Sequence, residues 1–514
     1  MGIGSKIFKH TVIYSFGTIL GKLISFLMLP FYANIFRTEG YGVIAMIDTS
    51  LGLFTIMFAG GVHTAITRIY HEHSRETQCL VLGTAIRIVW IVGAIAVTLP
   101  LIFSKTISNV LLGSQQYYTL FCIALITFVI EVAGQSASTI LIIRQKSIAF
   151  SSVELIRLII GVTFNILLVI MMDIGLIGIF ISSFLSTAMS AAIYHILSFK
   201  ESGLGFDGKI ALELLRFQLP LIPGELIAFL GRQAERVIVR IMLGLEGMGV
   251  LEMAYKFPPL LNLLIVIPFT RAWRTKCIEI ADREGSQDVI GRMFTNFLFV
   301  VIFAGLLLAV TIPYLLEVMT PAEFWNASRI AQIEILSTIL AASSSYMVFG
   351  ILIRQQTAVI SIIKSALTPV KIILAFALIY AWGLAGAAYS ALVIEVLTLI
   401  WISVKSQSFY SITLEYKKIG MIICGAAMIF VMLDGNNYTT SGPARYFKEH
   451  FLRPVLLCLQ SSPLGDGKSG RLVRALMIKE DQLVAIIFNS AISSILWVLF
   501  PFVKQRRLVG SRMS

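Results

Sequence analysis

Hydrophobic residues follow one another along this chain in runs of about 20, separated by short polar segments. A helix of about 20 apolar residues crosses the roughly 30 Å hydrocarbon layer of a bilayer. No stretch alternates apolar and polar positions strictly enough to predict the strands of a membrane barrel. The pattern therefore predicts an all-α polytopic membrane protein. We place fourteen spans at about 11–35, 41–67, 80–103, 117–143, 153–172, 175–198, 217–243, 250–270, 293–316, 328–353, 358–381, 384–404, 419–433 and 482–503.

The composition supports the membrane class, since 57% of the residues are hydrophobic and only 13% are charged. A soluble domain has about half apolar and about a quarter charged residues. The first span is too long for a cleaved signal peptide, carries Lys22 near its middle and has no small-residue cleavage site. We therefore expect it to remain as the first transmembrane helix.

Lysine and arginine are distributed unequally between the two sets of short loops. One set holds most of them, whereas the opposite set holds little beyond Arg37 and Lys105. Because positive loops stay in the cytoplasm, this asymmetry predicts that both termini are cytoplasmic. The formal net charge of +13 then reflects topology and attraction to anionic lipids. We expect no nucleic-acid partner.

The five cysteines lie in separate spans and loops without CxxC spacing. This arrangement argues against a disulfide framework and against a zinc site. The pair His71 and His73 is spaced i, i+2 in a polar loop, which is more typical of a solvated surface than of a metal site. We expect neither a metal nor a cofactor.

The chain contains an internal repeat. Three separate similarities recur at offsets of 207, 210 and 208 residues: GYGVIAM at 40–46 with GMGVLEM at 247–253, ILIIRQ at 140–145 with GILIRQ at 350–355, and GLIG at 175–178 with GLAG at 383–386. Chance recurrence in an apolar composition explains one such match more readily than three at nearly one offset. The matches indicate a duplication in which helices one to six correspond to helices seven to twelve. Since six is even, both copies start from the same side and form a parallel repeat.

The repeat predicts two six-helix lobes, at 1–200 and 201–410, followed by two further helices in 411–514. A long polar loop at about 434–481 separates these last two helices. If the short span at 419–433 does not cross, the loop becomes cytoplasmic and the C-terminus lies outside. Transporters built from two such repeats place the substrate site between the halves.

Charged residues interrupt several of the predicted spans. A charge at a helix centre costs about 2.5 to 3.5 kcal/mol on insertion scales. Well inside the spans we count seven bases (Lys22, Arg87, Arg232, Arg236, Lys256, Lys364, Lys371) and five acids (Asp48, Glu131, Glu235, Glu334, Glu395). Pairing within the protein is one explanation for any single residue. For the whole set, a wet cavity with a basic patch is the better explanation.

The two signs of charge indicate two roles. Arginine's planar fork matches phosphate oxygens, so the cavity cations are candidates for binding an anionic substrate: Lys22, Arg232, Arg236, Lys256, Lys364 and Lys371. A carboxylate beside a lysine at low dielectric can exchange a proton or a sodium ion. The candidates for such ion coupling are Asp48, Glu131, Glu235 and Glu395. The sequence does not choose between coupling and simple pairing.

Several motifs, taken in order, resemble a known family. They are Lys22 and Pro30 leading into EGYG (39–42), GGVHTAITRIY (60–70), LPLIPGELIAFLGRQAERVIV (219–239), AYKFP (254–258), AWR (272–274) and GLAGAA (383–388). Over about residues 8–405 the chain is similar to the polysaccharide repeat-unit flippases of the O-antigen type. Their superfamily also holds the lipid II flippase and multidrug exporters. One departure is Glu235 before Arg236, where the family pattern has an aspartate.

The resemblance implies two helical lobes around a basic central cavity that work by alternating access. It implies movement of a polyprenyl-pyrophosphate-linked sugar unit across the bacterial cytoplasmic (inner) membrane, for surface polysaccharides such as lipopolysaccharide. The implied partners are this lipid-linked oligosaccharide, membrane lipids and polysaccharide assembly proteins. No bond is made or broken, so we expect no enzyme, no catalytic residue and no cofactor.

Two other functions remain open at this point. A multidrug or cation exporter of the same superfamily should have an acidic cavity, and the excess of bases disfavours it. A membrane polymerase or ligase of sugar chains would use the 434–481 loop, with Arg445, His450 and Arg453 as its active site. That function leaves the repeat and the charges within the spans unexplained.

Overall fold

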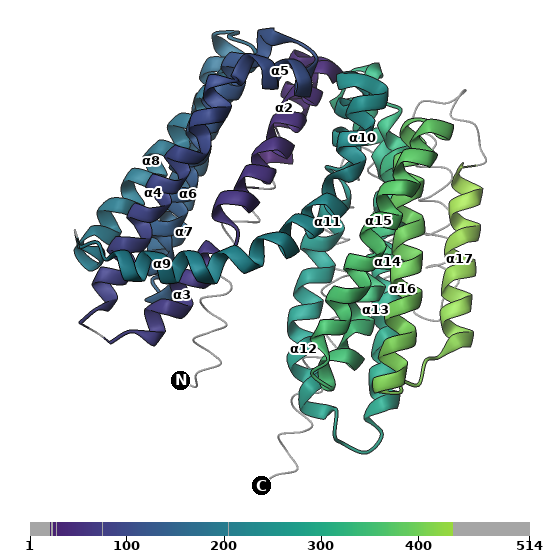
Figure 1. The fold of residues 1–514 in the computed structure, drawn as a ribbon. Helices are drawn as coiled ribbons and strands as arrows, with labels where there is room; N and C mark the ends of the chain where they lie inside the picture. The colour runs from purple at the N-terminus through teal and green to yellow at the C-terminus, as the bar shows by residue number, and fades with distance from the viewer. Residues whose placement is uncertain (1–20, 22–23, 27, 75, 204, 435–514) are drawn as a thin grey trace, which may run out of the picture. The chain divides into compact units, whose positions relative to one another are not determined.

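The computed structural model describes residues 21, 24–26, 28–74, 76–203 and 205–434 (Figure 1). Every regular element in these residues is a helix, which confirms the all-α prediction. Lys22, most of the predicted first span, the long loop with its Arg445, His450 and Arg453, and the predicted last span lie outside the described residues.

The helices follow the predicted order along the chain. Up to the middle they are α2 (Leu29–Ala59), α3 (Val62–Glu72), α4 (Gln78–Ile102), α5 (Ser104–Leu112), α6 (Tyr118–Ile143), α7 (Ser147–Asn165), α8 (Leu176–Ser202) and α9 (Gly208–Gln218). They continue with α10 (Ile222–Ala254), α11 (Pro258–Leu261), α12 (Ile267–Ile280), α13 (Ser286–Met319), α14 (Ala327–Ile353), α15 (Thr357–Trp382), α16 (Leu384–Phe409) and α17 (Tyr416–Asp434). We call α2 to α8 the first repeat and α10 to α16 the second repeat.

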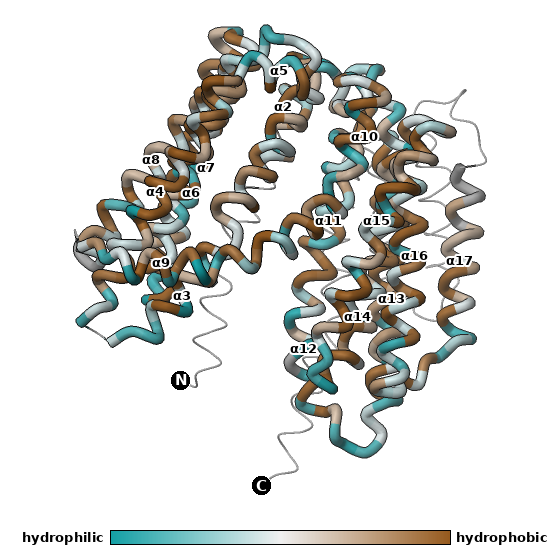
Figure 2. Tube along the Cα trace, viewed as in Figure 1, coloured by the Kyte–Doolittle hydropathy of each residue, from teal (hydrophilic) through white to brown (hydrophobic). Residues whose placement is uncertain are grey.

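Among the described residues, nine helical segments are long and apolar enough to cross a membrane. They confirm a multi-pass membrane protein. Figure 2 shows apolar residues along most helices and polar residues gathered at turns such as the one between α12 and α13. Helix α10 is long but is not among the nine, because it carries the charged stripe around Arg232, Glu235 and Arg236. The total of fourteen spans stays a prediction.

The repeat is visible in the backbone as well as in the sequence. Arg37 within α2 (φ 55°, ψ −170°) and Gly244 within α10 (φ 78°, ψ −171°) interrupt their helices with nearly the same dihedral angles. These residues are 207 positions apart, which is the offset of the motifs that follow them. A positive φ recurs likewise at Gln145 (55°) and Gln355 (58°). Equivalent positions therefore share conformations that non-glycine residues rarely adopt.

The two repeats meet where α2 packs against α10, the most extensive helix–helix contact of the described chain. A methyl group built on Gly42 would overlap the carbonyl oxygen of Leu245, and one built on Gly249 would overlap that of Thr38. These two contacts are equivalent under the repeat. Glycine has no Cβ, so each backbone approaches its partner's carbonyl closely, as at small-residue interfaces between membrane helices.

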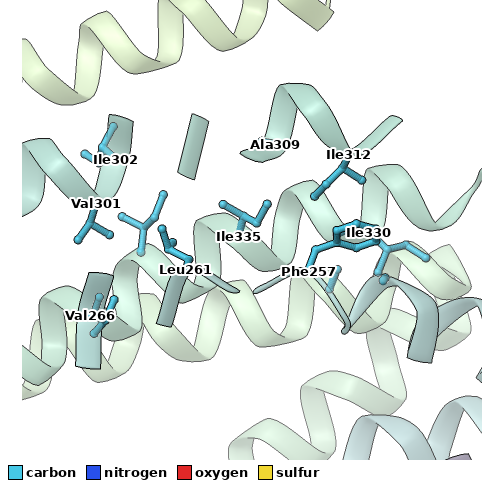
Figure 3. Packing of buried hydrophobic residues seen from close by; sticks show 14 of the residues in the cluster. Phe257, Leu261, Val266, Val301, Ile302, Ala309, Ile312, Ile330 and Ile335 are labelled. Carbon is cyan, nitrogen blue, oxygen red and sulfur yellow. The ribbon is translucent and has the colours of Figure 1, made fainter. Parts of the chain in front are cut away.

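Each repeat has its own cluster of buried apolar residues. The cluster of the second repeat includes Phe257, Leu261, Val301 and Ile335, which come from α11, α13, α14 and the turn before α11 (Figure 3). The other cluster is formed mainly by α3, α4 and α6. The first turns of α2 pack into the second repeat's cluster through Leu29 and Ala33. The predicted lobe boundaries at 200/201 and 410/411 stay predictions.

We predict that Gly42→Ala and Gly249→Ala each lower the apparent melting temperature of the purified protein. The added methyl group must displace backbone, and overpacking of this kind costs about 1 to 3 kcal/mol. Gly224→Ala is the matched control, because nothing lies within 4 Å of a Cβ at that position. If the three variants melted alike, the reciprocal contact would not hold the repeats together.

Candidate functional site

Glu235 on α10 is a buried carboxylate, with only 3% of the residue exposed. Its Oε1 lies 3.1 Å from Lys371 Nζ on α15 and accepts a hydrogen bond from Ser390 Oγ on α16 at 3.3 Å. Its Oε2 accepts one from Tyr255 OH at 2.8 Å. We call these four residues the Glu235 cluster. A buried charge is costly unless it is paired and hydrogen-bonded, and this cluster meets both conditions.

A second cluster begins at Arg236, the next residue along α10, and is centred on Glu252. Arg236 Nε and Nη2 both approach Glu252 Oε2 at 3.0 Å, and Lys256 Nζ lies 3.0 Å from Glu252 Oε1. The Arg236 guanidinium also stands over the Tyr255 ring, 4.9 Å from its centroid. Two cations therefore share one carboxylate in this Glu252 cluster. It carries a net positive charge and retains donors for an anion.

Two further cations of the second repeat differ from these in their contacts. Arg232 on α10 and Lys364 on α15 are exposed, and among the described residues neither makes an ion pair or a donated side-chain hydrogen bond. Their charges are thus not neutralised by direct contact with a described acid. They are predicted cavity cations that are exposed and have no ion-pair partner among the described residues.

The other acids of the second repeat lie near the Glu235 cluster. Glu334 on α14 and Glu395 on α16 each interact electrostatically with Glu235 and Lys371. Oε1 of Glu334 is buried and has no hydrogen-bond partner among the described residues. The structure therefore brings together three of the predicted site residues, Glu235 on α10, Lys371 on α15 and Glu395 on α16.

In the first repeat, Glu131 on α6 pairs with Arg157 on α7 at 2.9 Å. Asp48 on α2 is exposed and lies within electrostatic range of Glu131, and also of Lys256 and Arg236 in the second repeat. Asp48 is thus near charged groups of both repeats. Arg87 on α4 instead donates to the backbone carbonyl of Gly205, which fixes the segment before α9.

Sequence reasoning missed Glu252, Glu154 and Arg157 as interior charges. The reason is the position of helix ends. Helix α7 begins at Ser147 rather than at 153, and the helix after the Gly244 kink begins several residues before 250. Residues that the prediction places at span edges therefore lie one to three turns inside the observed helices. The polar turn before each span indicates an earlier start of the helix. A prediction that used these turns would have placed the three charged residues inside the helices.

We predict that Lys371→Met lowers the stability of the purified protein strongly, by about 3 to 5 kcal/mol, because Glu235 is left buried without its cation. The double variant Lys371→Met with Glu235→Gln should recover most of this loss, measured as apparent melting temperature. Lys276→Met is the control, because its partner Glu279 is exposed, and it should leave melting unchanged. Equal melting of Lys371→Met and the wild type would contradict the buried ion pair.

Known proteins were compared with the chain by sequence and by fold. The polysaccharide biosynthesis protein family matches residues 7–274, just over half of the chain. The Lsg locus putative protein 1 of Haemophilus influenzae is 34% identical over 90 residues, which cover 18% of this chain and 22% of that relative. The chain is thus aligned with only about a fifth of this relative's length.

The fold is similar to two groups of solved transporters. A structure described as lipid II flippase MurJ in an inward closed conformation matches with a TM-score of 0.70 at 15% identity, covering 87% of this chain and 97% of that one. An inward-facing multidrug resistance MATE family transporter matches with a TM-score of 0.55 at 14% identity, covering 77% and 94%. At such identities the likeness concerns the fold. The family that the motifs predict is confirmed by the match to residues 7–274: this chain belongs to the polysaccharide biosynthesis protein family.

Proposed function

We propose that this protein is a flippase that moves a polyprenyl-pyrophosphate-linked oligosaccharide repeat unit across the bacterial cytoplasmic membrane for surface polysaccharide assembly. The family membership and the flippase-like fold support this proposal. The observation that carries it is the incomplete neutralisation of the second repeat's cations. Arg236 and Lys256 share one carboxylate, and Arg232 and Lys364 have no direct acidic partner among the described residues.

The pyrophosphate is the part of the substrate that these cations recognise. Arg232 and Lys364 bind it first because they are exposed and have no direct acidic partner among the described residues, and Arg236 and Lys256 contribute donors that Glu252 does not fully occupy. Lys371 acts mainly through Glu235, whose charge it balances. Lys22 keeps its predicted role as a further cation of the same site. The polyprenyl chain stays in the bilayer while the charged head crosses.

The α2–α10 contact is the pivot for alternating access in this proposal. At Gly42 and Gly249 no side chain separates the two backbones, so α2 and α10 can rotate on each other there. Arg37 at the α2 kink pairs with Glu323 of the second repeat at 3.3 Å, and both side chains are exposed. Such an exposed pair is worth little energetically, so it can break when the repeats move.

Among the four carboxylates predicted for ion coupling, Asp48 and Glu395 are better placed than Glu131 and Glu235. Glu131 and Glu235 already have a cation within 3.1 Å. Asp48 and Glu395 make no hydrogen bond or ion pair through their carboxylates within the described part of the chain, although both lie near cations. A coupling proton or sodium ion reaches these two without displacing a partner. We therefore assign coupling to Asp48 and Glu395.

We predict that the double variant Arg232→Gln with Lys364→Gln slows flipping of a lipid-linked oligosaccharide in proteoliposomes about tenfold or more. Each lost charge-assisted contact weakens binding by about 1.5 to 3 kcal/mol, and 1.4 kcal/mol is a factor of ten. The matched control removes the same net charge at exposed positions of α12 and α17, as Lys276→Gln with Lys418→Gln. The control should flip at the wild-type rate.

Transport assays in the same proteoliposomes distinguish the proposed flippase from the rival cation exporter. Transport of a cationic dye by the wild type, together with unchanged oligosaccharide flipping in the Arg232→Gln and Lys364→Gln double variant, would overturn the proposal in favour of a cation exporter. Its fold likeness to a multidrug transporter is the observation that favours this second candidate.

A further inference from the structure

A cavity of about 390 Å³ lies within the first repeat, between α3, α6, α7 and α8. Ligand pockets usually measure about 300 to 1,000 Å³. Its buried lining consists mainly of small polar residues and one tyrosine: Ser138, Thr139, Thr187, Ser190 and Tyr194. Its exposed lining consists of His63, Thr67, Gln135 and Ile142. Neither the predicted cation site nor the ion pairs of the second repeat account for this cavity.

The charges in this cavity differ in sign from those of the Glu252 cluster. Arg157 Nη2 lies 2.9 Å from Glu131 Oε1, and Arg157 also interacts electrostatically with Glu154. Glu154 Oε1 accepts a hydrogen bond from Tyr194 OH at 2.7 Å. Two carboxylates thus face one guanidinium. The surplus negative charge disfavours a phosphate in this cavity.

The hydroxyl groups of the cavity add acceptors. Ser138 and Thr139 both donate to the carbonyl of Gln135, and Ser190 donates to that of Thr187. The protons of Ser138 and Ser190 are therefore occupied by the backbone, while their oxygen lone pairs remain available, whereas Thr139 Oγ1 also lies 2.7 Å from His63 Nδ1. A ligand for this cavity must supply several hydrogen-bond donors.

One wall of the cavity is aromatic. The rings of Phe150 and Tyr194 lie 5.9 Å apart at an interplanar angle of 30°. A ligand that suits these surroundings carries hydroxyl donors on its edges and apolar C–H groups on its faces. This combination is the chemistry of a sugar ring.

The cavity also lies near the proposed pyrophosphate site. Asp48 is within electrostatic range of Glu131 on the cavity side and of Arg236 and Lys256 on the other. A sugar bound directly to a pyrophosphate needs two adjacent sites, one for an anion and one for hydroxyl groups. The two charged regions around Asp48 provide this pair.

We propose that the cavity between α3, α6, α7 and α8 binds the saccharide of the lipid-linked substrate. Glu131 and Glu154 accept hydrogen bonds from sugar hydroxyls, Gln135 and Arg157 donate to sugar oxygens, and Phe150 contacts the face of a ring. This inference rests on the proposed flippase function and adds a second recognition site to it. It gives Glu131 a role in binding rather than in ion coupling.

The test compares two ligands on the full-length protein in nanodiscs. One is the polyprenyl pyrophosphate glycan extracted from the native host, and the other is the same polyprenyl pyrophosphate without its glycan. We predict that the wild type binds the glycosylated lipid more tightly. Glu154→Gln combined with Tyr194→Phe should lower affinity for the glycosylated lipid about tenfold, since two hydrogen bonds are lost, and leave affinity for the bare lipid within twofold.

Three further variants keep the result interpretable. Phe150→Leu retains an apolar side chain but removes the ring, so it should lower the affinity for the glycosylated lipid only. This variant tests the site even if the double variant does not fold. Arg232→Gln with Lys364→Gln should lower the affinity for both lipids. Glu279→Gln, an exposed position outside both sites, should change neither affinity.

The outcomes separate the two proposals. If the cavity variants lowered the affinity for both lipids equally, or for neither, the saccharide site would be wrong and the flippase function would stand. The same conclusion would follow if the wild type bound the two lipids with equal affinity while flipping persisted. If the wild type bound neither lipid, the flippase function would fail, and the saccharide site with it.

Discussion

A charge inside a membrane protein needs a partner or water, and this constraint organises the second repeat. The Glu235 carboxylate holds together three helices, because its acceptors are occupied by Lys371 on α15, Ser390 on α16 and Tyr255 at the end of α10. Arg236, the next residue, turns to Glu252 instead. One fully neutralised carboxylate therefore lies beside a cluster with a surplus cation. In the proposed function, this surplus cation binds the anionic part of the substrate.

The two repeats share a backbone plan but differ in the charge they enclose. Their kinks at Arg37 and Gly244 and their glycine contacts are equivalent. The first repeat nevertheless encloses two carboxylates around Arg157, whereas the second has two cations around Glu252. A duplicated fold with unlike interiors suits a substrate that is itself unlike at its two ends, anionic at the pyrophosphate and hydroxylated at the sugar.

The amino-acid sequence predicted the helices, the repeat and the charged stripe of α10, because apolar periodicity and spacing determine which residues share one face. It did not predict the partners of that stripe. Spacing along α10 places Glu235 and Arg236 on neighbouring positions, but only tertiary packing decides that one meets Lys371 and the other Glu252. The cavity around Arg157 was missed because the start of α7 was placed six residues too late.

The central claim is that the cations of α10 and α15 line a wet, anion-binding cavity. It is tested most directly by thiol labelling of single-cysteine proteins in which Cys79, Cys122, Cys277, Cys424 and Cys458 are replaced by serine. A charged, membrane-impermeant maleimide should label Arg232→Cys and Lys364→Cys, and polyprenyl pyrophosphate glycan should slow this labelling. It should not label Ile373→Cys, an apolar position on α15 that is 69% exposed. Labelling of none of the three positions would place Arg232 and Lys364 in hydrocarbon and contradict the account.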